Sequence, residues 1–215
     1  EEVMIVKRVL VTCAHSDDAV IGCGGTIKEF TDKGIEVLAV SVCGDRINGF
    51  DKAMSMLGAD FIALKNSYGK INMDVMISDL KNIFEDFNPD VVFTHWTNEI
   101  LYDHELVSKQ VIKLARQYDH DILLYELPAT SVDFTFDVAV DITRSYTFKL
   151  KALFEMKEAF DVETFKNEVL PSVVYAPGYR GILTGCKYAE VFKSLGVRKP
   201  LSPYGRRLMD IEKLL

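Results

Sequence analysis

The sequence predicts a single Rossmann-like α/β domain over residues 1–215, with a mostly parallel sheet and helices on both of its faces. Short, nearly all-apolar runs recur at residues 8–14, 35–43 and 91–94, as expected of strands that are buried on both faces. Stretches with the apolar spacing of helices separate these runs, and this alternation is typical of a parallel sheet covered by helices. The length of 215 residues fits one compact domain.

Glycines mark the ends of the first two predicted helices, because glycine readily adopts the left-handed conformation that follows a helix. The helix at 26–33 ends at Gly34, and the helix at 50–57 ends at Gly58. The next predicted elements are, in order, a strand at 60–64, a helix at 74–87, the strand at 91–94, a helix at 103–118 and a strand at 122–125.

The signals become less regular after Pro128. Residues 136–142 alternate between apolar and polar side chains, which predicts a strand at the edge of the sheet. A helix is expected at 146–160, with 161–170 continuing or restarting it. From Pro171 onward, prolines and glycines interrupt the pattern, so we expect an irregular tail that wraps the domain.

Composition limits the class of protein. A formal net charge of −7 argues against a nucleic-acid-binding protein, because phosphate contacts need a basic face. No apolar run approaches the roughly 20 residues of a membrane span, and the acidic N-terminus carries no signal-peptide pattern. We expect a cytoplasmic protein with four reduced and mostly buried cysteines, at positions 13, 23, 43 and 186.

Polar side chains follow three of the predicted strands. They are His15, Ser16, Asp17 and Asp18 after the first strand, Asp45 and Arg46 after the second, and His95, Asn98, Glu99, Asp103 and His104 after the strand at 91–94. Ligands of open α/β sheets bind beyond the carboxyl ends of the strands. These three loops are therefore expected to meet at one rim of the sheet.

The first of these loops is suited to holding a metal ion. His15 and Asp18 are good ligands for a divalent cation, and Asp17 beside them is available as a general base for a metal-bound water. His104 is the best placed of the other histidines to complete the set. The alternative is structural, because Ser and Asp are also common helix-capping residues.

A glycine-rich segment offers a competing hypothesis. Gly22, Gly24 and Gly25 could form a phosphate-binding turn, with Asp45 contacting a ribose. Their spacing is not G-x-G-x-x-G, and the segment begins seven residues after His15. Close packing of a helix against the sheet is the simpler explanation of these glycines.

Motifs spread along most of the chain resemble those of the PIG-L/LmbE-like family of zinc-dependent N-deacetylases. The family's A-H-P-D-D-E and l-G-c-G-G-t patterns correspond to residues 14–19 and 21–26 here. Its P-D-v-V-f-t-H strand and D-x-H-x-D-H motif correspond to residues 89–95 and 99–104. Further matches are Val140-Asp141-Ile142-Thr143, the helix from Lys149 to Leu153, and the Arg180-Gly181 and Tyr188-Ala189-Glu190 segments.

The resemblance implies a role for each matched residue. It makes His15, Asp18 and His104 ligands of Zn²⁺, or of another divalent metal, and Asp17 the general base. Arg46 matches an arginine that holds the sugar or its phosphate. The implied reaction removes an acyl group, typically acetyl, from the amine of an amino sugar or its conjugate.

Several positions depart from the family pattern. Leu101 stands where the family has the histidine of H-x-D-H, which is implied to stabilise the charged tetrahedral intermediate, and leucine cannot donate a hydrogen bond. His95, together with Tyr102, is a candidate to replace that donor, so His95 joins Arg46 as a predicted substrate-binding residue. Ala19 replaces a glutamate of the motif.

The sequence thus favours a zinc-dependent N-deacetylase and leaves two alternatives open. One is a catalytically impaired relative that binds a metal or a sugar, and the other is a dinucleotide-binding protein. The expected partner is a small amino-sugar substrate, and both a nucleotide-linked substrate and a homo-oligomer remain open.

Overall fold

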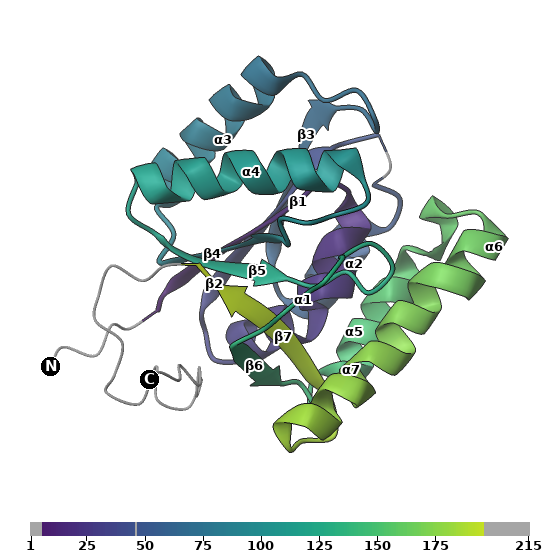
Figure 1. Cartoon of the computed structure of the whole chain (residues 1–215). Coiled ribbons are helices and arrows are strands. Elements are labelled where there is room, and N and C mark those ends of the chain that lie inside the picture. The colour runs from purple at the N-terminus through teal and green to yellow at the C-terminus, as the bar shows by residue number, and fades with distance from the viewer. Residues whose placement is uncertain (1–5, 46, 196–215) are drawn as a thin grey trace, which may run out of the picture.

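The computed structural model describes residues 6–45 and 47–195. Within these residues, seven strands form one sheet in the order β3-β2-β1-β4-β5-β7-β6 (Figure 1). The parallel strands are β1 (Arg8–Cys13), β2 (Glu36–Cys43), β3 (Asp60–Asn66), β4 (Val91–His95) and β5 (Asp121–Tyr125). Strand β7 (Ala189–Ser194) pairs antiparallel with both β5 and the edge strand β6 (Val138–Asp141). The predicted α/β fold with a mostly parallel sheet is confirmed.

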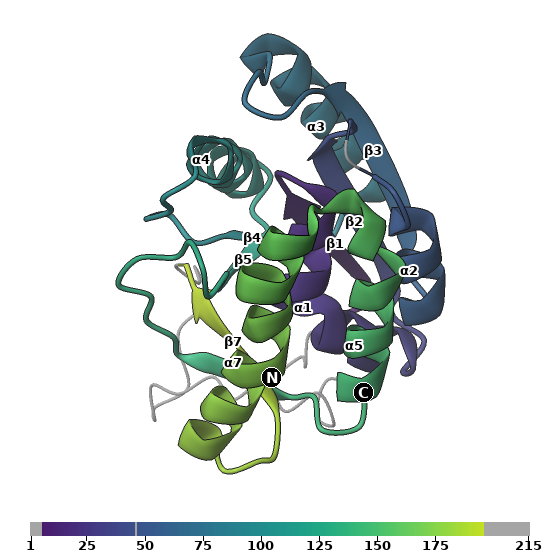
Figure 2. The same ribbon diagram turned by 90° about the vertical axis from the view of Figure 1, so that its right-hand side faces the viewer.

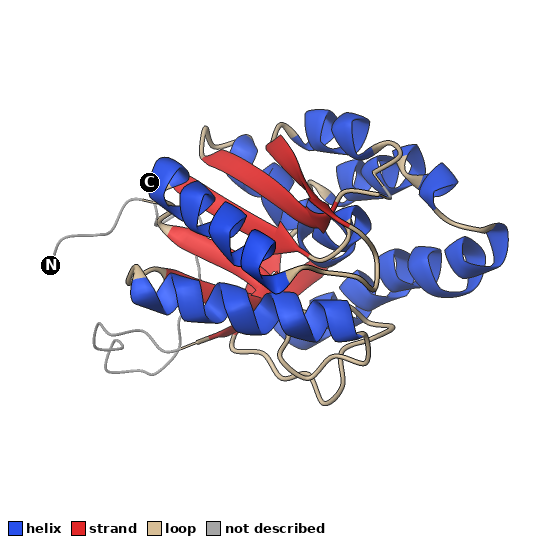
Figure 3. Cartoon of the chain, turned by 90° about the horizontal axis from the view of Figure 1, so that it is seen from above, coloured by secondary structure: helices blue, strands red, loops and turns tan. Residues whose placement is uncertain are grey.

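Helices cover both faces of the sheet, as the view from above shows (Figure 3). One apolar cluster lies between the sheet and α1 (Ser16–Thr31), α2 (Phe50–Leu57) and α5 (Tyr146–Glu155). A second cluster lies on the other face, under α3 (Met73–Phe87) and α4 (Tyr102–Gln117). The inner strands β1, β2, β4 and β5 are therefore buried on both sides, which explains their continuous apolar runs.

Helix α1 begins ten residues earlier than the sequence predicted, directly after His15. The carboxylate of Asp18 in its first turn accepts a hydrogen bond from the backbone N–H of His15 at 2.8 Å. Gly22 and Gly25 therefore lie inside a helix, and the phosphate-binding turn considered for them is wrong. Their lack of a side chain serves packing instead, since a Cβ on Gly22 would meet the ring of Tyr125 at 2.5 Å.

A buried ion pair joins α5 to strand β7 and also holds the backbone of α1. Lys149 lies 2.6 Å from Glu190, and the two residues are 1% and 4% exposed. Glu190 also accepts hydrogen bonds from the backbone N–H groups of Gly25 and Thr26, and Lys149 donates to the carbonyl of Ile21. Each charge is therefore compensated, as a buried pair requires.

The segment after Pro171 is not the irregular tail that the sequence predicted. Short helical segments, η1 (Lys157–Ala159), α6 (Val162–Thr164) and η2 (Phe165–Val169), lead into the long helix α7 (Leu170–Thr184), which lies beside α5 (Figure 2). Pro171 is tolerated in the first turn of α7, where a backbone N–H has no helical partner. The rest of the predicted tail, residues 196–215, lies outside the described residues.

Along the described ranges, 6–45 and 47–195, no helix combines the length and apolar character that crossing a membrane would need.

Candidate metal-binding active site

The candidate site lies where the strand order reverses. Strand β1 lies between β2 and β4, so the chain leaves β1 and β4 toward opposite sides. This is the position at which open α/β sheets bind ligands. His15 is the N-cap of α1, and Asp18 lies in its first turn. His104 lies in the first turn of α4. The sheet thus brings two helix N-termini, and their ligand-type side chains, to one point.

Three of the predicted ligand atoms form a compact triangle. Nδ1 of His15 lies 3.1 Å from Nε2 of His104. Oδ2 of Asp18 lies 3.6 Å from that Nδ1 and 3.5 Å from that Nε2. Ligands about 2.0–2.1 Å from a tetrahedral ion lie about 3.3 Å from one another. Two histidines and one carboxylate at this spacing fit a divalent cation and leave one coordination position open.

The second nitrogen of each histidine contacts a carboxylate. Nδ1 of His104 lies 3.2 Å from Glu99, and Nε2 of His15 lies 3.2 Å from Asp103. Metal-binding histidines usually donate their other N–H to such a partner, which fixes the tautomer and the orientation of the ring. The ring nitrogens that face the triangle then carry no proton, so each has a lone pair with which to bind a cation.

The two carboxylates are themselves held in place. Glu99 accepts hydrogen bonds from the hydroxyl groups of Thr130 and Ser131, in the loop after β5. Asp103 accepts one from the backbone N–H of Gly69 at 2.7 Å. Residues of two further loops therefore support the histidines from behind.

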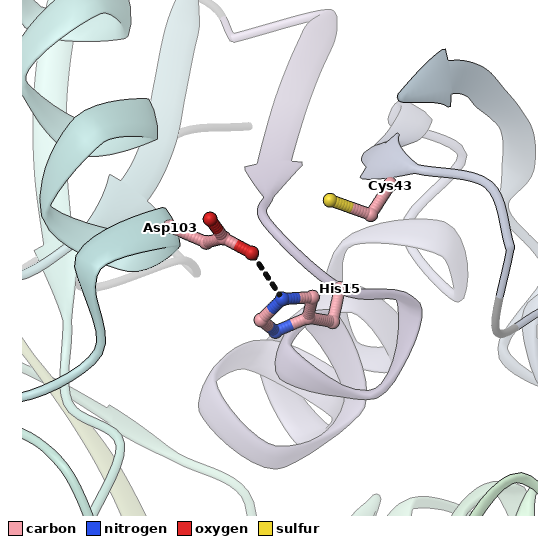
Figure 4. Close-up of side chains that lie close together, drawn as sticks. All are labelled: His15, Cys43 and Asp103. Carbon is pink, nitrogen blue, oxygen red and sulfur yellow. Dashed lines mark hydrogen bonds and ion pairs between the residues drawn. The ribbon is translucent and has the colours of Figure 1, made fainter. Parts of the chain in front are cut away.

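A second cluster, His15, Cys43 and Asp103, also brings ligand atoms within 4.8 Å of one another (Figure 4). Its nitrogen from His15 is the one already engaged by Asp103. Burial, followed by the charges of Asp103 and Asp45, raises the pKa of Cys43 to about 12. A thiol binds metals as the thiolate, so this cluster is a poorer metal site than the first.

The charge of the triangle affects His104. Burial is the largest single influence on its pKa and lowers it, but the charges of Asp18 and Asp17 and the contact with Glu99 together raise the pKa above its ordinary value. The metal-free protein therefore holds a proton on His104 more tightly than a free imidazole does. A cation that binds there competes with this proton.

Asp17 lies beside the triangle and lines the adjoining cavity. Burial, followed by the charge of Asp18, raises the pKa of Asp17 from 3.8 to about 6. Both adjacent carboxylates line the cavity, and Asp18 is the one that contacts the two histidines. A carboxylate with a pKa near neutrality can both accept and return a proton.

The cavity has a volume of about 630 Å³, within the range of small-molecule sites. His15, Asp17, Asp18 and His104 lie in its lining, together with Leu101. Its walls come from Tyr68, from the loop after β5 at Leu127, Pro128, Ala129 and Thr130, and from the segment between α5 and α7, including Asp161, Glu168 and Ser172.

His95 does not reach this cavity. Its side chain is fully buried, its Nε2 accepts a hydrogen bond from the backbone N–H of Ala14 at 2.8 Å, and its ring stacks on that of His104 at 4.3 Å. Burial, followed by the neighbouring histidines, holds the pKa of His95 well below its usual range. A neutral, packed imidazole supports His104, and this geometry gives no support to direct substrate binding by His95.

The other predicted substrate-binding residue, Arg46, lies outside the described residues. Leu101 lines the cavity, so the position that departs from the family pattern faces the site. Tyr102, the other suggested replacement for the missing donor, is 68% exposed and is not among the lining residues.

Glu99 and Asp103 were predicted to lie at the rim of the sheet, but the sequence suggested no role for them. Their closeness to His104 in the sequence is the signal that could have identified them as supports of the two histidines, Glu99 for His104 and Asp103 for His15. Tyr68, whose ring stacks on His15 at 4.6 Å, was missed. It belongs to the loop after β3, which carries no recognisable motif.

The fold and the donor set define an α/β protein with a candidate divalent-cation site at the switch point of its sheet. Residues 10–115 match the family model described as PIG-L: GlcNAc-PI de-N-acetylase. This match covers the strands and helices that carry all three members of the triangle. The chain is therefore similar to the PIG-L/LmbE-like family, the family that its motifs resemble.

Individual relatives agree with this family. An uncharacterized deacetylase, YaiS, of Escherichia coli K12 is 29% identical over 165 residues, covering 68% of this chain and 89% of the relative. The solved N,N'-diacetylchitobiose deacetylase of Pyrococcus horikoshii is similar in fold, with a TM-score of 0.77, 22% identity, and coverage of 93% of this chain and 88% of that one.

The same fold also carries a different reaction. GalB, a 4-carboxy-2-hydroxymuconate hydratase of Pseudomonas putida KT2440, matches with a TM-score of 0.78 and 19% identity, over 91% of this chain and 99% of that one. The fold alone therefore does not determine the chemistry, which depends on the residues of the site.

Proposed function

We propose that this protein is a metal-dependent hydrolase that removes an acetyl group from the amine of an amino sugar or its conjugate. The observation that carries the proposal is the triangle of His15, Asp18 and His104, whose atoms lie 3.1–3.6 Å apart, with the carboxylate of Asp17 beside it at the cavity. The match of residues 10–115 to a de-N-acetylase family model supports the same reaction.

His15, Asp18 and His104 would hold the cation, with zinc as the first candidate because a site with three protein ligands and one open position is typical of catalytic zinc. Bound there, a divalent cation supplies Lewis acidity, which lowers the pKa of a nearby water and polarises an amide carbonyl. Glu99 and Asp103 keep the two imidazoles oriented throughout.

Asp17 does the proton transfer. Its carboxylate accepts a proton from the attacking water as the new C–O bond forms at the amide carbon. It then delivers that proton to the nitrogen as the C–N bond breaks, which leaves acetate and a free amine. A pKa of about 6 suits both halves of this cycle near neutral pH.

The substrate class rests on the relatives and on the cavity. The family description and the chitobiose deacetylase both name N-acetylated amino sugars. A cavity of about 630 Å³ with acidic and hydroxyl groups in its lining, including Asp161 and Ser172, suits a sugar that carries several hydroxyl groups.

The test is acetate release from a panel of N-acetylated amino sugars, measured with zinc-loaded wild type, Asp17→Asn and Asp32→Asn. Asp32, exposed at the far end of α1, is the matched control. We expect turnover by wild type and Asp32→Asn, and a loss of about 10²–10⁴-fold in kcat with Asp17→Asn. No release from any amide by wild type, although it binds zinc, would contradict the proposal and favour a non-catalytic binding protein.

A further inference from the structure

The cavity at the metal-binding triangle is lined by charges of one sign. Its lining contains the carboxylates of Asp17, Asp18, Asp161 and Glu168, and no lysine or arginine is found among the described residues that line it. A divalent cation on the triangle offsets the charges of Asp17 and Asp18 beside it. Asp161 and Glu168 come from the segment between α5 and α7, where no described basic side chain of the lining balances them.

Asp161 and Glu168 belong to the same wall of the cavity. Asp161 is the N-cap of α6. Thr164 and Glu168 follow it by three and seven residues, which is the spacing of side chains on one side of a helix. All three residues line the cavity. The segment between α5 and α7 therefore turns an acidic face toward the substrate.

The two carboxylates keep their charge. The backbone N–H and the hydroxyl group of Thr164, followed by the backbone N–H of Glu163, donate hydrogen bonds to Asp161 and hold its pKa below the ordinary value. These donors are uncharged, so they fix the carboxylate without cancelling its charge. Glu168 forms no ion pair with a lysine or arginine of residues 6–45 and 47–195.

From this arrangement we propose that the cavity recognises a protonated amine in the group attached to the N-acetylated sugar, and that Glu168, assisted by Asp161, determines this preference. An ammonium group has three hydrogen-bond donors and no acceptor, and a carboxylate without an ion pair is a strong partner for it. The ring of Phe160 also lines the cavity and offers a face on which a cation packs. The proposal rests on the function proposed above and narrows its substrates to conjugates that carry a free amine.

The same wall disfavours substrates with an acidic group. A phosphate or carboxylate attached to the acetylated sugar would meet the charges of Glu168 and Asp161, and like charges repel. An uncharged group gains and loses little there. Arg46, for which the family resemblance implies a contact with the sugar or its phosphate, lies outside the described residues. An anionic ligand is therefore one of the probes in the experiment.

The experiment measures binding by calorimetry to zinc-loaded Asp17→Asn protein, so that no ligand is consumed. The probes are the 4-aminobutyl, 4-hydroxybutyl and 3-carboxypropyl glycosides of N-acetylglucosamine, whose linkers match in length and differ only in charge. Because Asp161 and Glu168 are exposed to solvent, we expect the amine to bind about three- to fivefold more tightly than the alcohol. The carboxylate should bind more weakly than the alcohol, and added salt should reduce both differences.

Three variants assign the preference to this wall. Glu168→Gln should remove most of the advantage of the amine and leave the affinity for the alcohol within twofold. Asp161→Asn should reduce the advantage, because asparagine keeps the helix cap and loses the charge. Glu163→Gln is the matched control. Glu163 lies in the same segment but does not line the cavity, so this change of the same net charge should leave the advantage intact.

Equal affinity for the amine and the alcohol, tighter binding of the carboxylate, or no binding of any probe would overturn this proposal. So would an advantage that survives Glu168→Gln, or one that Glu163→Gln reduces equally. Acetate release by wild type from the same glycosides separates the two proposals. A preference for the amine without acetate release contradicts only the proposed function, whereas acetate release without this preference contradicts only the recognition of an amine.

Discussion

The cavity at the metal-binding triangle and the surface of α7 at Tyr175 and Tyr179 are built differently. They are called the inner end and the outer end below. At the inner end, His104 is 1% exposed and His15 is 7% exposed, and each imidazole contacts a carboxylate on either side. At the outer end, Tyr175 is 72% exposed and contributes mainly surface. The inner end is fixed by many mutual contacts, while the outer end is a surface that can change without disturbing the fold. The inner end can therefore hold reacting groups in a fixed geometry, whereas the outer end tolerates substitution.

The largest gain in rate is expected at Leu101, which lines the inner end without offering a donor. Leu101→His adds a hydrogen-bond donor where the family has one, and a single donor to a tetrahedral intermediate contributes about 10²–10³ in rate in comparable sites. We expect kcat for acetate release to rise by at least about tenfold, and Leu101→Met to leave it unchanged. An unchanged rate with both variants would mean that the inner end is already complete.

The next effect concerns the support of His104. Glu99→Gln weakens the contact that orients the imidazole, so zinc affinity should fall by about 10–100-fold. A competition assay with a chromophoric chelator measures this. Glu105→Gln is the control, because Glu105 lies on α4, the helix that carries His104, and pairs with Lys109 at the surface. An equal loss in both variants would show that Glu99 has no special role.

The raised pKa of Asp17 predicts a pH-dependent stability of the metal-free protein. Because the native state holds this proton more tightly than the unfolded chain, the stabilisation is complete below pH about 4 and is lost as the pH rises through about 6. In the Asp17→Asn variant, the side chain at position 17 is neutral at every pH. At about 1.4 kcal/mol per pKa unit, we expect the free energy of unfolding of Asp17→Asn to exceed that of wild type by about 1–3 kcal/mol at pH 8.

Denaturant unfolding in the presence of a chelator checks this prediction at pH 8 and at pH 4. The advantage of Asp17→Asn should disappear at pH 4. An advantage of the same size at both pH values would mean that the ionisation of Asp17 does not cause it.

The smallest effect is expected at the outer end. Because Tyr175 and Tyr179 are mostly exposed, Tyr175→Ala and Tyr179→Ala should change the free energy of unfolding by less than about 0.5 kcal/mol. Thermal unfolding monitored by circular dichroism measures this. A loss above about 2 kcal/mol would show that these rings hold α7 in place, and the contrast between the two ends would fail.

Much of the inner end could be predicted from the sequence because its parts lie within short motifs. The strand at 91–94 and the polar residues after it stand together in the chain, as do His15 and Asp18. Strands that are buried on both faces also leave a clear apolar signal. The start of α1 was missed because three glycines, which disfavour a helix, lie inside it and are needed for packing.

The outer end could not be predicted, because tertiary contacts decide its structure. Pro171, Pro177 and Gly178 suggested an irregular tail, yet α7 is a helix and packs against the sheet. Strand β7 follows it and pairs antiparallel with β5. The burial of His95, whose position after a strand suggested a site residue, likewise depends on neighbours that only the fold brings together.

The central claim is that His15, Asp18 and His104 bind one divalent cation. The most direct test is the metal content of purified protein, after zinc loading and gel filtration, for wild type, His104→Ala and His120→Ala. His120 lies beyond the opposite end of α4 and serves as the control. We predict about one equivalent of zinc per chain in wild type and His120→Ala, and almost none in His104→Ala. Zinc retained by His104→Ala, or absent from wild type, would contradict the account.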